Sequence, residues 1–132
     1  MKPRTNRYLA VAILLSVFSG CTSNNPVAAK QDYIYHVVVA WLKQPGDTEA
    51  QQALIDGTKS LRDIPGVIAV SAGRTFASER AVVDDSFDVA LTIVLKDQAA
   101  LASYQNHPVH NKVKSETLKP LVARYIVYNY VD

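Results

Sequence analysis

The stretch from Asp32 to Lys43, DYIYHVVVAWLK, is rich in β-branched and aromatic residues and predicts a β-strand. Alternate side chains of a strand point to opposite faces of its sheet. One face of this strand carries Tyr33, Tyr35, Val37, Val39 and Trp41, and the other carries Ile34, His36, Val38, Ala40 and Leu42. Both faces are largely apolar, so each must be covered by something.

The rest of the chain predicts the order strand, helix, strand, strand, helix, strand. The turn QPGD precedes the first helix, with Asp47 or Thr48 as its N-cap, and Gly57 within this helix implies a close neighbour. The order predicts an α+β fold, a ferredoxin-like β-α-β-β-α-β sandwich with both helices on one face of an antiparallel sheet. The expected elements are a helix from Ala50 to Ile64, strands over 67–76, 86–96 and 123–131, and a helical region over 97–118 interrupted at Pro108 and followed by Pro120.

An isolated copy of this fold would leave one apolar face of the sheet in water. The last strand is apolar on both faces too, with Ile126, Tyr128 and Tyr130 opposite Tyr125 and Val127. The exposed area would exceed the few hundred Å² usual for a monomer. We therefore expect a homodimer with the two sheets face to face.

The N-terminus predicts export. Three basic residues precede the apolar run Tyr8–Phe18, which is too short to span a bilayer. The segment FSGC, which ends at Cys21, resembles the lipobox of bacterial lipoproteins. It implies that residues 1–20 are a signal peptide, that Cys21 is lipidated, that residues 21–31 form a tether, and that 32–132 form the domain. In that pattern, Thr22 implies the periplasmic face of the outer membrane; the alternative is an ordinary signal peptide with an incidental cysteine.

Charge and cysteine content exclude several classes of function. Loss of residues 1–20 removes three of the 14 basic residues and none of the 12 acidic ones, so the remainder is close to neutral. It has no basic stripe for nucleic acid. Cys21 is the only cysteine, and its lipidation leaves no thiol for a disulfide, so the domain depends on its hydrophobic core.

Four segments together resemble the stress-responsive A/B barrel (Dabb) family: YIYHVVVAWLK, IPGVIAVSAGRTF, SFDVALTIVLKDQAALASYQNHPVH and RYIVYNYVD. The likeness covers Tyr33 to Asp132 and is most specific at His36 and in the run Tyr104–His110. It implies a ferredoxin-like dimer that closes into a barrel. Most members have no established activity, whereas a plant branch acts as polyketide cyclases that use a tyrosine and a histidine of this run for an aldol condensation.

The run YQNHPVH (104–110) contains the candidate site. Pro108 favours an extended His107 as the N-cap and places His110 in the first helical turn, where the helix N-terminus favours a neutral imidazole that can accept a proton. The resemblance implies that Tyr104 and His110 form the acid–base pair and that His36 and His107 line the same pocket. Where the cyclases carry an aspartate that holds the histidine, this chain has Asn129, which can orient an imidazole but adds no charge.

Three functions are compatible with these residues. The first is a lipid-anchored periplasmic homodimer that binds a small apolar or aromatic molecule, with His36, His107 and Asn129 as ligand-binding residues. The second is a cyclase or lyase that uses Tyr104 and His110. The third, metal binding by the three histidines, is weak because His-x-x-His across a proline break does not reliably converge. We predict no metal and no cofactor. The alternative to a ligand-binding role is a core packing role for His36 and a helix-capping role for His107.

Overall fold

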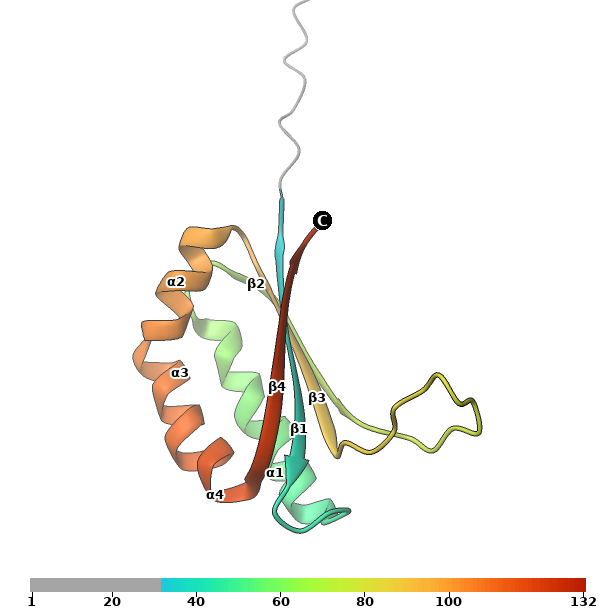
Figure 1. Cartoon of the computed structure of the whole chain (residues 1–132). Helices are drawn as coiled ribbons and strands as arrows, with labels where there is room; N and C mark the ends of the chain where they lie inside the picture. The colour runs from blue at the N-terminus through green and yellow to red at the C-terminus, as the bar shows by residue number, and fades with distance from the viewer. Residues whose placement is uncertain (1–31) are drawn as a thin grey trace, which may run out of the picture.

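The computed structural model describes residues 32–132, so the predicted signal peptide, Cys21 and the tether lie outside the described residues. The described chain forms a four-stranded antiparallel sheet in the order β2-β3-β1-β4, with its helices on one face (Figure 1). This confirms the predicted ferredoxin-like α+β fold. Its elements are β1 (Ile34–Leu42), α1 (Thr48–Lys59), the 3₁₀ turn η1 (Ser60–Asp63), β2 (Val67–Arg74), β3 (Val89–Leu95), α2 (Gln98–Asn106), α3 (Pro108–Val113), the π-helical turn η2 (Lys114–Leu118), α4 (Lys119–Leu121) and β4 (Val122–Val131).

The helix-facing side of the sheet is the core. Alternate residues of β1 and β3 are buried there, as the alternation along each strand predicts. Their partners are Leu54 of α1, Leu61 and Ile64 near η1, and Tyr104 of α2, all nearly inaccessible to solvent. β1 pairs with β3 on one side and with the edge strand β4 on the other.

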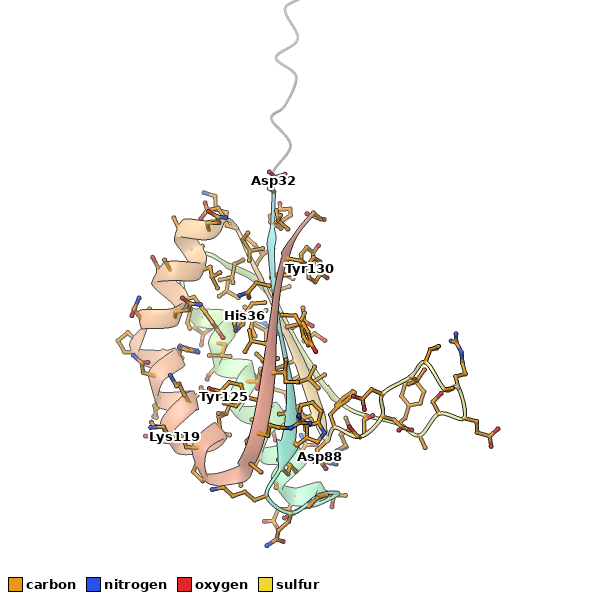
Figure 2. The ribbon with its side chains drawn as sticks, in the orientation of Figure 1. Asp32, His36, Asp88, Lys119, Tyr125 and Tyr130 are labelled. Carbon is orange, nitrogen blue, oxygen red and sulfur yellow. The ribbon has the colours of Figure 1, made fainter. Side chains whose placement is uncertain are left out.

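The opposite side of the sheet is apolar and uncovered in a single chain. Tyr35 of β1 stacks on Tyr130 of β4, with ring centroids 4.8 Å apart, and the Arg124 guanidinium lies 3.7 Å from the centre of the Trp41 ring. Figure 2 shows Tyr130 on this side and His36 on the side of the helices. Tyr128 and Tyr130 stay more than half exposed, so the expected second apolar face is present.

A buried carboxylate holds the start of α1 to the sheet. Asp88, just before β3, accepts hydrogen bonds from the backbone N–H groups of Leu42 (2.8 Å) and Gly46 (2.7 Å). Gly46 has φ +75°, a conformation that glycine adopts without a steric penalty. Of the two candidate N-caps, Asp47 is the one used: its side chain accepts from the N–H groups of Glu49 and Ala50.

The helical layer is closely packed at Gly57, as predicted. A Cβ placed on Gly57 would lie 2.9 Å from Oγ1 of Thr117 in η2. The prediction that helical structure ends before Pro120 is wrong, because helix continues to Leu121. Pro120 has no N–H to donate, and the preceding turn widens so that the Lys119 N–H bonds to the Lys114 carbonyl.

Strands β2 and β3 are shorter than expected, and the segment between them extends away from the sheet edge as an arm (Figure 1). A hydrogen bond from the Ser78 N–H to Asp85 (2.8 Å) crosses its base. Phe76 and Val82 in this arm are each 83% exposed. Across residues 32–132, the helices are all too short or too polar to cross a membrane.

Candidate functional site

A cavity of about 420 Å³ lies between the sheet and the helical layer. Aliphatic side chains from both layers contribute to its wall, among them Val38 of β1, Leu54 of α1 and Leu118 of η2, and Val127 and Tyr125 of β4 also line it. Figure 2 shows Tyr125 on the side of the helices, as it does His36. Three of the residues predicted from the sequence, His36, Tyr104 and His110, line this one cavity.

Tyr104 is at the centre of the polar group. Its side chain is 1% exposed, and its ring contacts His36 edge-on (centroids 5.6 Å apart) and His110 at a tilt (4.6 Å). Burial raises the pKa of the Tyr104 phenol well above its ordinary value of 10. The phenol is therefore protonated at neutral pH and can donate a hydrogen bond or a proton, but it is a poor base.

His110 is held as a neutral imidazole. Its Nδ1 lies 3.1 Å from the Gln105 carbonyl oxygen, and because a carbonyl can only accept, Nδ1 carries the proton and Nε2 is the unprotonated nitrogen. Burial is the main cause that lowers the pKa of His110 below 6.5; the Gln105 hydrogen bond opposes this, and the positive charge of Lys114 adds to it. This direction agrees with the predicted neutral imidazole. The main cause is burial, whereas the sequence had indicated the helix N-terminus.

His36 has the same tautomer for a different reason. Its Nδ1 lies 2.7 Å from Oδ1 of Asn129, which faces it across the β1–β4 pair. The amide oxygen accepts, so Nδ1 carries a proton, and in the neutral imidazole Nε2 is the hydrogen-bond acceptor. Asn129 thus orients His36 and not His110, which corrects the role that the cyclase pattern implied.

His107 lies apart from this cluster. It is extended (φ −69°, ψ 139°) and caps α3 as predicted, with Nδ1 accepting from the Val109 N–H at 3.2 Å. It is not among the residues that line the cavity, so the expectation that it shares the pocket of His36 is wrong: its ring folds back onto the first turn of α3. Within residues 32–132, no group of three or more His, Cys, Asp or Glu residues is placed to hold a metal ion.

Lys114 lines the same cavity and was missed by sequence reasoning. It lies four residues after His110, a spacing that puts two side chains on the same face of a helix. That spacing could have indicated it.

The fold and this cavity define a class: a ferredoxin-like domain with a polar tyrosine–histidine cluster between its sheet and its helices. Residues 34–132 match the family model described as Stress responsive A/B Barrel Domain (Dabb), and the chain belongs to this family.

Solved structures share the fold. A Dabb family protein from Mesorhizobium loti is 26% identical, with a TM-score of 0.62 and 77% of this chain and 98% of that chain covered. A dimeric ferredoxin-like protein of unknown function from Thermobifida fusca is 16% identical (TM-score 0.63; 78% and 93% covered). A hydroxynitrile lyase from Passiflora edulis is 17% identical (TM-score 0.66; 77% and 94% covered). No curated protein matches the chain.

Proposed function

We propose that the protein is a homodimer, anchored by lipid on Cys21 to the periplasmic face of the outer membrane, that binds a small apolar or aromatic molecule. The observation that carries the binding proposal is the cavity of about 420 Å³, which has apolar walls and a few convergent polar groups. Cavities of roughly 300–1,000 Å³ with this composition are typical ligand sites.

The polar groups indicate how a ligand is held. Nε2 of His36 and Nε2 of His110 are free to accept a hydrogen bond, and the Tyr104 hydroxyl is free to donate one. A ligand with an apolar body and hydroxyl or carbonyl oxygens would satisfy these groups. Without a ligand, water in the cavity would have to satisfy these groups.

The homodimer is supported by the uncovered side of the sheet, where Tyr35, Tyr128 and Tyr130 lie together. A second copy covers this surface with an identical one, as two-fold symmetry requires. Proteins of similar fold from Thermobifida fusca and Jannaschia are described as dimeric. The lipid anchor and the periplasmic location rest on residues 1–22 of the sequence.

A second candidate function is catalysis of a cyclase or lyase type. The rings of Tyr104 and His110 lie 4.6 Å apart, with a neutral imidazole able to take a proton beside a phenol able to give one. A protein of similar fold is a hydroxynitrile lyase. Against this candidate, Asn129 contacts the other histidine and supplies no charge to stabilise an imidazolium on His110.

Binding is tested with N-phenyl-1-naphthylamine, an uncharged dye that fluoresces in apolar cavities. Val127→Trp fills the cavity from β4, at a site 38% exposed where the added volume does not displace the core. Val131→Trp places the same residue on β4 outside the cavity and is the matched control. We expect the wild type and Val131→Trp to bind the dye and Val127→Trp to lose at least about tenfold in affinity, or ~1.4 kcal/mol. Equal binding by all three would contradict the proposal.

Catalysis is tested separately with a β-polyketone and with a cyanohydrin as substrates. The enzyme proposal expects turnover by the wild type and its loss in His110→Ala with the dimer still folded. Dye binding without turnover of either substrate would support the binding proposal and contradict the catalytic one.

A further inference from the structure

Lys114 brings a positive charge to the cavity. It is the first residue of η2 and lines the cavity beside His110. It lies four residues, about one helical turn, after His110, and its charge contributes to the lowered pKa of that imidazole. The residue itself is solvent-exposed, which places the ammonium at the rim and not in the interior.

No acidic side chain balances this charge within the cavity. The lining residues include no Asp or Glu. Glu116, two residues along η2, is 4.0 Å from Lys112. Lys114 takes part in neither the Lys59–Asp56 nor the Lys112–Glu116 ion pair of the described residues.

The Lys114 ammonium therefore has no acidic partner among the residues that line the cavity, which include apolar side chains and two histidines. Apolar walls reduce the screening by water, so an anion at this rim is attracted more strongly than at an open surface, whereas a cationic ligand is repelled. Tyr104 is buried and Lys114 is exposed, so these two lining residues mark the inner and outer ends of the cavity. A ligand with its apolar body against the walls would present an inner oxygen to Tyr104 and its outer end to Lys114.

We propose that the ligand of this cavity is an apolar or aromatic acid, and that Lys114 binds its anionic group at the rim. This inference rests on the proposed binding function and narrows its ligand class from any apolar molecule to a singly charged anion. Lys114 is a specificity-determining residue: it selects acids over neutral molecules of the same shape.

The test compares two dyes that differ by one sulfonate: 1-anilinonaphthalene-8-sulfonate and the uncharged N-phenyl-1-naphthylamine. Lys114→Met keeps the aliphatic stem and removes the charge. Lys119→Met changes the net charge equally, at a helical position outside the cavity. We expect Lys114→Met to weaken the binding of the anionic dye about five- to tenfold and that of the neutral dye less than about twofold. Lys119→Met should weaken the binding of neither dye.

Two further measurements separate a charge effect from a packing effect. Lys114→Arg keeps the charge and should retain most of the affinity for the anionic dye. Salt at about 0.5 M should weaken the binding of that dye to the wild type more than its binding to Lys114→Met, because salt screens the charge. The Lys114→Met change should also raise the pKa of His110, followed by NMR titration, because a neighbouring positive charge is lost.

The outcomes separate the two proposals. Suppose that Lys114→Met binds both dyes as the wild type does and that Val127→Trp abolishes the binding of both. The cavity then binds apolar molecules without selecting acids, so the inference about Lys114 is overturned and the proposed binding function is kept. If the wild type binds neither dye, or Val127→Trp binds both unchanged, the proposed binding function fails and the inference fails with it.

Discussion

Replacing Gly57 with alanine should destabilise this protein, although the same change stabilises most helices. Glycine inside a helix costs about 1 kcal/mol relative to alanine. At Gly57 the new Cβ would lie 2.9 Å from Oγ1 and 3.0 Å from Cγ2 of Thr117. Overpacking of this kind costs about 1–3 kcal/mol, so we expect Gly57→Ala to lower the free energy of unfolding by about 1 kcal/mol.

A second substitution isolates the cause. Thr117→Ala removes both close atoms and leaves only the Thr117 Cβ position, 3.3 Å away. In that background Gly57→Ala should stabilise the protein by about 0.5–1 kcal/mol, because the helix propensity gain remains and most of the clash is gone. The change of sign corresponds to a coupling of about 2 kcal/mol in the double-mutant cycle.

Urea denaturation followed by circular dichroism measures the four unfolding free energies. The protein concentration must be equal throughout, since dimerisation adds to apparent stability. If Gly57→Ala stabilises the wild type by the full helix propensity value, or has the same effect in both backgrounds, then α1 does not pack on η2 as closely as described. The cavity wall formed by these two elements would then need another explanation.

Asp88→Ala should lower the free energy of unfolding by about 2–4 kcal/mol, because the N–H groups of Leu42 and Gly46 lose their carboxylate acceptor in a buried site. A loss under about 1 kcal/mol in the same denaturation assay would contradict this. Burial holds the pKa of His110 in the folded protein below 6.5, so the unfolded chain binds a proton at His110 more tightly than the folded protein does. The stability that His110 contributes is therefore present above about pH 6.5 and is lost as the pH falls toward the folded-state pKa. Denaturation at about pH 7.5 and about pH 5.5 should show a smaller pH effect in His110→Gln, and equal slopes would rule the assignment out. Tyr130→Glu places a charge in the proposed dimer face and should give a single subunit in light scattering, whereas an intact dimer at micromolar concentration would show that this face is not the interface.

Much of this architecture could be predicted from local sequence patterns. The two-residue alternation of β1 identified both faces of the strand, and proline chemistry identified His107 as an N-cap. Gly57 in a helix indicated a close neighbour before the neighbour was known. These features depend on residues near one another in the chain, where backbone stereochemistry limits the choices.

The pairing of polar side chains could not be predicted in the same way. Asn129 and His36 are 93 residues apart and meet because of the register of β4 on β1. A register shifted by one residue would have turned Asn129 to the opposite face. His107 and His110 are three residues apart, yet only His110 lines the cavity, because the capping bond turns the His107 ring back onto α3.

The sequence alone therefore determined the order of the elements, the apolar character of both sheet faces and the presence of a tyrosine–histidine group, since each follows from short-range periodicity or residue type. The tertiary structure decided which histidine Asn129 orients, how strongly burial perturbs Tyr104 and His110, and that Lys114 reaches the same cavity. Those properties arise from strand register and from the distance between helices and sheet, which are set by contacts between distant parts of the chain.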